Sequence, residues 1–246
     1  MQLKPNGVTE CFNRGSSQLF LKDEGLIALT SDGSIDFTPL DFDVPLTIDQ
    51  RAYLRKKYGV DVCQVFWRKQ IHGDNILAAH GGVGTIKGCP DADAYITDEK
   101  NLPIAIRTAD CVPVFIFDPR RRVIGLAHAG WKGTTKMIAA KTVQRMQEKY
   151  ASQASDLKIA LGPSIRECCY QVGAEFRDYF PSYVKERGGH LYLDVISANR
   201  DQLLQASVRQ ENIFDSGICT CCNKNYFSFR RDGAKAGRMI SLMVLL

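Results

Sequence analysis

Histidine is scarce in this chain, with four among 246 residues. A multicopper oxidase holds several copper ions largely through imidazoles, so this small number excludes that architecture. The sequence also lacks an apolar run near the roughly 18 residues of a membrane-spanning helix, and no charged, apolar and small-residue leader opens it. We therefore expect a cytoplasmic protein with no membrane partner.

Long runs of one charge are absent as well. The formal net charge is +5, from 32 basic and 27 acidic residues that are scattered along the chain. This balance does not favour nucleic acid as a partner, although it is compatible with a phosphate-bearing substrate. The nine cysteines, in a chain without a secretory leader, indicate reduced thiols or metal ligands and not a disulfide framework.

Linkers, internal repeats and low-complexity segments are missing too. With 246 residues, 45% of them hydrophobic, the chain is long enough to bury a substantial core. We therefore predict a single domain over residues 1–246, built from both helices and strands.

The centre of the sequence has the pattern of a β-hairpin. Two apolar runs, 112–117 and 123–127, are joined by an Asp-Pro turn and three arginines. If the runs pair antiparallel, Cys111 before the first and His128 after the second lie at the same end of the sheet. A thiolate and an imidazole that meet there form either a metal site or a nucleophile with its base.

The remaining segments show both kinds of periodicity. Thr47 and Gln50 fit a capping box before a helix over 51–58, Ser197 would cap another helix, and Thr134 begins a helix with one apolar face. The other predicted elements are strands at 60–67, 95–97, 158–161, 191–196, 226–229 and 239–246 and a short helix at 174–180.

His72 follows one of these strands and could join the Cys-His pair. Two imidazoles and one thiolate at strand ends are a familiar zinc set, and three protein ligands leave a fourth position open for water or substrate. Cys111 and His128 alone could instead form a hydrolase dyad, with a third group that orients the base. Asp91 and Asp93 point the same way on an extended segment, where they could hold a substrate hydroxyl, orient a metal-bound histidine or cap a turn.

The other cysteines give a weaker signal. Cys168 and Cys169 are adjacent, and because neighbouring side chains diverge we expect buried small residues there. Cys219, Cys221 and Cys222 could bind a structural zinc, or one of them could fill the fourth position beside the histidines. No second Cys or His pair is near them in sequence, which disfavours a separate zinc site.

Several short blocks of sequence carry a resemblance to a known family. In chain order they are QIHG at 70–73, DADA at 91–94, RTADC at 107–111, HAGWKG at 128–133, GP at 162–163, CCYQVG at 168–173 and FRRDG at 229–233. Together they resemble the laccase-domain family, whose members were named polyphenol oxidases and are regarded as multifunctional purine nucleoside phosphorylases. The likeness runs from about residue 64 to the C-terminus.

This resemblance implies a zinc-dependent purine nucleoside enzyme with zinc at His72, Cys111 and His128, and copper as a second possible metal. It implies an α/β (α+β) fold, a single-domain sandwich of mixed β-sheets with flanking helices, similar to the catalytic domain of cytotoxic necrotizing factor toxins. The implied reactions are phosphorolysis of adenosine, inosine, guanosine and methylthioadenosine, and deamination of adenosine. Purine nucleosides and phosphate would then be the partners of the protein.

These reactions need groups that move protons and hold phosphate. Beside a metal-activated water, Asp93 and Asp110 are the candidate catalytic carboxylates. Asp93 is slightly preferred, because alternation along a strand would turn Asp110 away from the face of Cys111. The candidates for a cationic phosphate cradle are Arg14, Arg107, Lys132 and Arg230.

The first sixty residues depart from the family pattern. Members usually carry a glycine- and serine-rich entry segment with a phosphate-binding arginine, and here residues 13–16 stand in its place. Three alternative hypotheses are a Cys-His hydrolase or amidase acting on cell-wall precursors, a copper-dependent phenol oxidase and a non-catalytic metal-binding protein. The sequence carries no signature of an oligomeric state.

Overall fold

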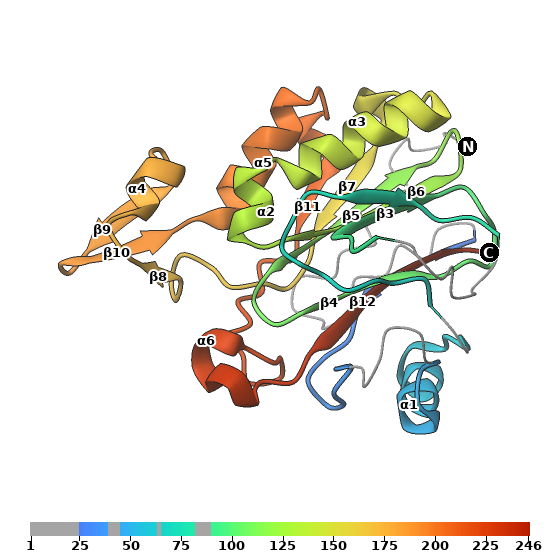
Figure 1. Ribbon diagram of the computed structural model, residues 1–246, viewed down its shortest axis with the longest axis horizontal. Coiled ribbons are helices and arrows are strands. Elements are labelled where there is room, and N and C mark those ends of the chain that lie inside the picture. Colours follow the sequence, from blue (N-terminus) through green and yellow to red (C-terminus); the bar gives the residue numbers. More distant parts are fainter. Residues whose placement is uncertain (1–24, 39–44, 63–64, 82–89) are drawn as a thin grey trace, which may run out of the picture.

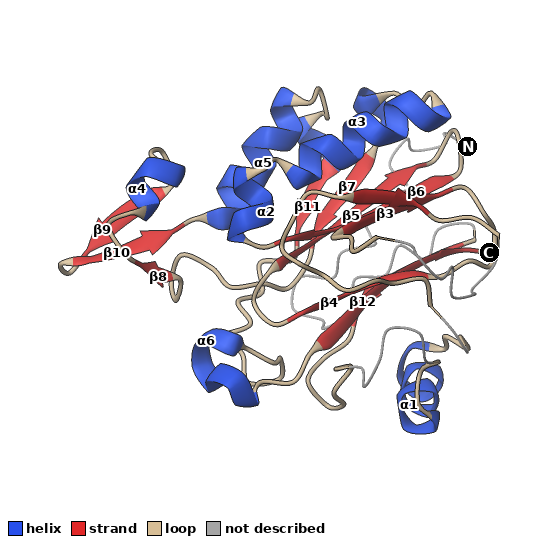
Figure 2. Cartoon of the chain, in the orientation of Figure 1, coloured by secondary structure: helices blue, strands red, loops and turns tan. Residues whose placement is uncertain are grey.

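The computed structural model of the chain describes residues 25–38, 45–62, 65–81 and 90–246. Within these residues, strands from distant parts of the sequence form two stacked sheets with helices on their outer faces (Figure 1). A third, smaller sheet projects at one end, beside a short helix (Figure 2). The mixed α/β character with several sheets agrees with the predicted fold class.

The largest sheet has six strands in the order β11-β7-β5-β6-β3-β2. Two of its pairs, β11 with β7 and β2 with β3, are parallel, and the other neighbours are antiparallel. Its strands are β2 (Ile76–Ala78), β3 (Ala94–Thr97), β5 (Val112–Asp118), β6 (Val123–Ala129), β7 (Lys158–Leu161) and β11 (Ile213–Asp215).

The other two sheets have three strands each and are antiparallel throughout. The order is β1-β12-β4 in the sheet that stacks on the large one, and β8-β10-β9 in the projecting sheet. The strands are β1 (Leu26–Thr30), β4 (Ile104–Thr108), β8 (Gln171–Val172), β9 (Val184–Arg187), β10 (His190–Leu193) and β12 (Met239–Leu245).

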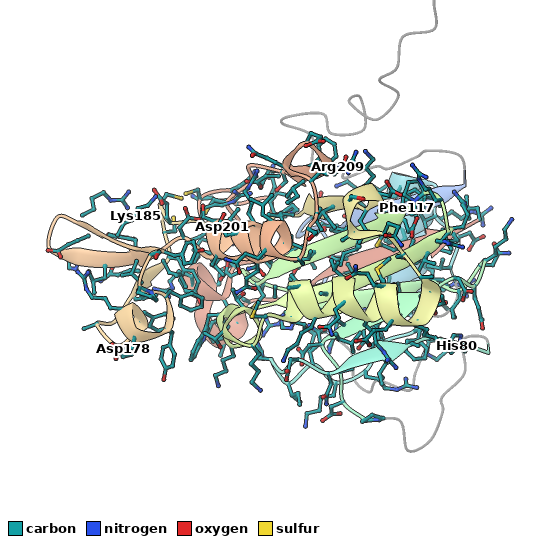
Figure 3. All side chains as sticks on the ribbon, turned by 90° about the horizontal axis from the view of Figure 1, so that it is seen from above. His80, Phe117, Asp178, Lys185, Asp201 and Arg209 are labelled. Atoms are coloured by element: carbon teal, nitrogen blue, oxygen red, sulfur yellow. The ribbon has the colours of Figure 1, made fainter. Side chains whose placement is uncertain are left out.

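The helices lie on the two outer faces of this stack or toward the end that carries the projecting sheet (Figure 1). They are α1 (Ile48–Tyr58), α2 (Trp131–Thr135), α3 (Ile138–Tyr150), α4 (Phe176–Tyr179), α5 (Val195–Gln205) and α6 (Phe229–Asp232), with single 3₁₀ turns at Ala154–Asp156, Gln210–Asn212 and Gly233–Lys235. Figure 1 shows α2, α3 and α5 over the large sheet and α1 under the other one. Seen from above in Figure 3, Asp178 and Lys185 of the projection lie at the end opposite to His80 and Phe117. No helix in the described part of the chain is long and apolar enough to cross a membrane.

The hairpin of β5 and β6 is buried at every position because both of its faces are covered. Val114 and Ile116 pack in the cluster that includes Val143 of α3, whereas Phe115 points to the cluster between the two sheets. A third cluster joins the smaller stacked sheet to α1 through residues such as Leu54. A strand that is covered on both faces reads as a continuous apolar run, which is the pattern of this sequence.

Local sequence signals placed several elements correctly. The Thr47 hydroxyl accepts the N–H of Gln50, and the Gln50 side chain accepts the N–H of Thr47 at 2.9 Å, so the capping box is confirmed. The helix that follows begins at Ile48, three residues before the predicted 51–58. The predicted strand 158–161 coincides with β7.

Two predictions failed because a capping side chain starts a helix elsewhere. The segment 226–229 is not a strand, since the Ser228 hydroxyl accepts the N–H of Arg231 and caps α6. Ser197 is not the N-cap of its helix. Asp194 is, and its carboxylate accepts the N–H and the hydroxyl of Ser197 at 3.0 and 2.8 Å.

Two further elements differ in extent from their predictions. In the described part of the predicted strand 60–67, a single bridge between Phe66 and Ile104 replaces the strand. The helix predicted from Thr134 is split into α2 and α3, because Met137 has a left-handed backbone with φ 61°. Left-handed residues interrupt a right-handed helix.

Candidate metal centre and its cavity

The predicted hairpin brings Cys111 and His128 to one end of the large sheet. β5 and β6 pair antiparallel, with Val112 opposite Ala129 and Pro113 opposite His128. Cys111 directly precedes β5, so it lies beside the end of β6. The hairpin geometry expected from the sequence is confirmed.

His72 joins this pair from the turn that precedes β2. One ring nitrogen of His72, one of His128 and the Sγ of Cys111 lie within 4.8 Å of one another. The two imidazole rings meet edge to face, with 4.8 Å between centroids. Within the described ranges, no other His, Cys, Asp or Glu joins this group, which we call the candidate metal centre.

Asp93 holds two of these ligands in place. Its buried carboxylate accepts the backbone N–H groups of Ile71, His72 and Gly73, at 3.1, 3.0 and 2.7 Å. Its Oδ1 also lies 2.8 Å from Nδ1 of His128. With Nδ1 bonded to a carboxylate, Nε2 of His128 is the nitrogen left for a metal. Of the roles considered for Asp93, orienting a histidine and capping a turn both occur.

The absence of a side chain at Gly130 leaves room for the side chains of Cys111 and His72. A Cβ atom at this position would lie 2.8 Å from the Sγ of Cys111 and 3.1 Å from Cδ2 of His72. Any larger residue would therefore displace Cys111 or His72, so the site requires glycine directly after β6.

The charges around Cys111 favour its thiolate. Burial alone would raise the pKa of this thiol, but the imidazoles of His128 and His72 outweigh burial and lower the pKa. Burial acts to lower the pKa of His128, yet Cys111 and the carboxylate of Asp93 raise it on balance. The thiolate is the form in which cysteine binds a metal or attacks a substrate.

The three ligands open on a cavity of about 830 Å³. This volume lies within the range of about 300–1,000 Å³ that is usual for small-molecule sites. Its cationic lining residues are Arg107, Arg230, Lys235 and Arg238, and its aromatic ones are Trp131, Tyr170 and Phe229. The 53% exposure of the Phe229 side chain gives the cavity an open aromatic face.

The two predicted catalytic carboxylates occupy different places. Asp110 lines the cavity, and its carboxylate accepts the hydroxyl of Thr220 at 2.7 Å and the N–H of Arg230 at 2.6 Å. Asp110 precedes the strand and has φ 89°, so alternation along β5 does not determine its direction. Asp93 does not line the cavity.

Only some of the predicted phosphate ligands line the cavity. Arg107 and Arg230 line the cavity, and burial lowers the pKa of Arg107 to about 10. Lys132 is exposed and does not line the cavity, and its Nζ lies over the ring of Trp131, 5.5 Å from the centroid. Arg14 lies outside the described residues.

Sequence reasoning missed Lys235 and Arg238, which line the cavity from the segment before β12. Arg238 is held by its Nη1, which donates to the carbonyl oxygens of Ala236 and Gly237 at 2.6 and 3.0 Å. The sequence signal that could have found them is their position just after the FRRDG block at 229–233 and before β12.

Four other cysteines form a separate group. The Sγ atoms of Cys168, Cys169, Cys219 and Cys222 lie within 4.8 Å of one another. Cys168 is exposed and Cys169 is half-buried, so the prediction of buried small residues is wrong. Because Cys219 and Cys222 belong to this group, they do not fill the fourth position of the candidate metal centre.

Two imidazoles, a thiol and an orienting carboxylate at the rim of a cavity form a candidate metal site on an α/β fold. The family described as "Multi-copper polyphenol oxidoreductase laccase" matches residues 43–246. The chain belongs to this family, and the resemblance seen in the sequence is confirmed.

Named relatives cover most of the chain. The purine nucleoside phosphorylase CA_C1699 of Clostridium acetobutylicum is 37% identical over 195 residues, which are 75% of this chain and 78% of that protein. The purine nucleoside phosphorylase YlmD of Bacillus subtilis is 37% identical over 212 residues, 80% of this chain and 76% of that protein.

Solved structures share the whole architecture. The hypothetical protein YfiH of Bacillus licheniformis has a TM-score of 0.81 at 27% identity, covering 96% of this chain and 100% of that one. YlmD of Geobacillus stearothermophilus has a TM-score of 0.80 at 27% identity, covering 96% and 98%.

Proposed function

We propose that this chain is a zinc-dependent purine nucleoside phosphorylase. The observation that carries the proposal is the convergence of His72, Cys111 and His128 at a cavity lined by cationic side chains. Two relatives that are 37% identical are named purine nucleoside phosphorylases. A metal beside cations suits a substrate pair of nucleoside and phosphate.

The donor set fits zinc. His72, Cys111 and His128 would hold the ion, and the Asp93 carboxylate on Nδ1 of His128 is the outer partner that zinc-binding histidines usually have. When bound, zinc would supply Lewis-acid polarisation of a substrate or water oxygen. Copper also binds thiolate and imidazole ligands, so phenol oxidation by a copper-loaded form would reflect loading and not the reaction of the protein.

Phosphorolysis forms a bond between a phosphate oxygen and C1′ of the ribose while the bond from C1′ to the purine nitrogen breaks. The residues that would hold phosphate through charge-assisted hydrogen bonds are Arg107, Arg230, Lys235 and Arg238. Tyr170 and Phe229 would offer aromatic faces for stacking of the purine.

We assign proton transfer to Asp110 and positioning to Asp93. Asp110 lines the cavity next to Cys111, where its carboxylate would take a proton from the attacking phosphate or water and pass it to the leaving purine or amine. The Asp93 carboxylate already accepts hydrogen bonds from three backbone N–H groups and one imidazole. This assignment reverses the order that strand alternation favoured.

The proposal covers adenosine, inosine, guanosine and methylthioadenosine as phosphorolysis substrates, and deamination of adenosine. It includes a single domain over residues 1–246, a likeness to the catalytic domain of cytotoxic necrotizing factor toxins and a cytoplasmic location. Arg14 stays a predicted phosphate ligand. Lys132 is left out because it does not line the cavity.

Product analysis with zinc-loaded protein tests this proposal. Incubation with inosine and phosphate should yield hypoxanthine and ribose 1-phosphate, and adenosine without phosphate should yield inosine, each identified by chromatography. A Cys111→Ser protein that is purified and loaded in the same way is the control, and its product yield should fall with its metal content. Absence of product from protein in which one zinc ion is bound by His72, Cys111 and His128 would contradict the proposal.

One observation favours a second candidate, a metal-independent Cys-His hydrolase or amidase. Asp93, His128 and Cys111 form a chain in which a carboxylate orients an imidazole beside a thiol. Hydrolysis of cell-wall precursor amides that survives metal removal and is lost on thiol alkylation would favour this candidate. Loss of all activity with the metal would exclude it.

A further inference from the structure

Cys168, Cys169, Cys219 and Cys222 form a group that the proposed function does not use, and we call it the four-cysteine cluster. The Sγ of Cys222 lies 3.5 Å from that of Cys168 and 3.2 Å from that of Cys169. All four Sγ atoms lie within 4.8 Å of one another, and none of them is in a disulfide. Four thiols from two distant segments therefore converge on one point.

The topology of the large sheet explains this convergence. β7 and β11 pair in parallel, so their carboxyl ends are adjacent, and one cysteine pair follows each strand. Beyond the ends of the two strands, an isolated parallel β-bridge links Ser164 and Cys219. The N–H of Ser164 donates to Ile218 at 3.2 Å and the N–H of Thr220 donates to Ser164 at 3.1 Å. The approach of the two pairs is thus built into the backbone.

Tight turns direct the sulfurs toward each other. The N–H groups of Cys169 and Tyr170 both donate to the carbonyl of Arg166, at 2.9 and 2.8 Å, which coils the segment that carries the first pair. The N–H of Asn223 donates to the carbonyl of Cys219 at 3.0 Å and coils the second. This coiling brings the sulfurs of adjacent cysteines toward one point although neighbouring side chains usually diverge.

A cationic side chain lies next to the four cysteines. The guanidinium of Arg187 donates to the carbonyl of Cys168 at 3.2 Å and so lies beside the cluster. A neighbouring cation favours the thiolate form, in which cysteine binds a metal.

The spacing of the sulfurs suits one tetrahedral ion. With metal–sulfur distances of about 2.3 Å, four thiolates around zinc lie about 3.8 Å apart, and the observed contacts of 3.2 and 3.5 Å and the limit of 4.8 Å bracket that value. An iron–sulfur cluster of two or four irons would spread its four thiolates farther apart, because they are shared among those irons.

From this geometry we propose that Cys168, Cys169, Cys219 and Cys222 bind one zinc ion in a closed structural site. Four protein thiolates fill the tetrahedral shell and leave no position for substrate, which is the arrangement of structural zinc. The donors are all sulfur, so the site selects a soft divalent ion and not magnesium or calcium.

The proposed ion would tie down the segment that supports the cavity. Thr220 lies between two of the ligands, and its hydroxyl donates to Asp110 at 2.7 Å. The guanidinium of Arg231 in α6 donates to the carbonyls of Thr220 and Cys221, at 3.0 and 3.2 Å. Fixing the loop around Thr220 therefore fixes the carboxylate of Asp110 and the start of α6.

Zinc stoichiometry tests the proposal. Full-length protein, purified in zinc, is analysed by native mass spectrometry and elemental analysis, together with Cys222→Ser, Cys221→Ser and His72→Ala. We expect two zinc ions per chain in the wild type and in Cys221→Ser, whose altered side chain lies in the same loop but outside the cluster. Cys222→Ser should hold one ion, at the candidate metal centre.

X-ray absorption at the zinc edge of His72→Ala keeps the test decisive if Cys222→Ser does not fold. Zinc in that protein should be surrounded by sulfur alone, at about 2.3 Å. Wild-type protein with one zinc ion and an unchanged count in Cys222→Ser would overturn the proposal. So would four cluster cysteines that stay fully reactive to a thiol reagent, or that are oxidised to disulfides, in zinc-saturated protein.

Discussion

The candidate metal centre and the four-cysteine cluster lie toward the same end of the large sheet, where β5 begins and β7 and β11 end, but they differ in their side chains and surroundings. The first takes two imidazoles and one thiolate from a buried hairpin and a preceding turn, and it opens on a cavity. The second takes four thiols from two loops beyond β7 and β11. Only the first has a carboxylate, Asp93, that orients a ligand.

If both groups bind zinc as proposed, cysteine serves two purposes in this protein. At Cys111 the three protein ligands would leave one coordination position open, which suits catalysis. In the cluster, four thiolates would fill the coordination shell and join two loops. Asp110, next to Cys111, connects the two regions: its carboxylate accepts the hydroxyl of Thr220 at 2.7 Å and its carbonyl accepts the N–H of Ile165 at 2.9 Å. The predictions below test whether the two regions are independent.

The largest effect is expected for Cys111→Ser. Loss of the thiolate should release zinc from the candidate metal centre and lower phosphorolysis by about 10³-fold or more, because several kcal/mol of Lewis-acid stabilisation corresponds to such a factor. Zinc content and steady-state rates measure this. The cluster zinc should stay bound, and loss of both ions from this variant would show that the two regions are coupled.

Asp110→Asn should lower kcat by about 100-fold, the usual contribution of a general acid or base. Both zinc ions should be retained, because Asp110 is hydrogen-bonded to Thr220 and Arg230 and is not among the converging ligands. Rates at saturating substrate, together with metal analysis, check this. An unchanged kcat would mean that another group transfers the proton.

Asp93→Asn should weaken zinc binding at the candidate metal centre by about 10–100-fold, as for other outer partners of zinc ligands. Activity should return at saturating zinc if Asp93 only positions His128. Titration of activity against free zinc measures this, with the cluster zinc as an internal reference. Activity that stays low at saturating zinc would assign the proton transfer to Asp93.

The smallest effects concern the cations around the cavity. Arg230→Ala should raise the KM for phosphate about tenfold, equivalent to one charge-assisted hydrogen bond of about 1.5 kcal/mol. Lys132→Ala makes the same change of charge outside the cavity and should stay within about twofold of wild type. Equal effects of the two variants would indicate a general effect of charge and not phosphate contact.

The candidate metal centre was predictable because its signals are local. The turn between β5 and β6 is formed by Asp118, whose carboxylate accepts the N–H groups of Arg120 and Arg121, each at 2.9 Å. Such a turn fixes the register of the two apolar runs. Cys111 and His128 then meet as a consequence of strand pairing.

The four-cysteine cluster was not predictable by the same reasoning. Its two pairs are about fifty residues apart, and only the parallel pairing of β7 with β11 brings them together. Parallel neighbours leave no turn signature in the sequence, because their connection is long. The absence of a second pair near Cys219 in sequence was therefore not an argument against zinc.

One error arose where two residues competed for one role. Asp194 and Ser197 are both good N-cap residues, and only the folded backbone shows that Asp194 caps α5. The direction of Asp110 depends on its left-handed backbone, which an alternation rule for strands does not represent.

The left-handed backbone at His72 and Asp110, with φ 56° and 89°, has a consequence for metal exchange. Such conformations are costly for residues with a side chain and persist where the surrounding structure enforces them. Asp93 enforces one of them by binding three consecutive amides, and these bonds need no ion. Zinc should therefore enter a site whose backbone is already ordered, with little change in heat capacity. If zinc binds there as proposed, the protein should lose and regain the ion while keeping its shape.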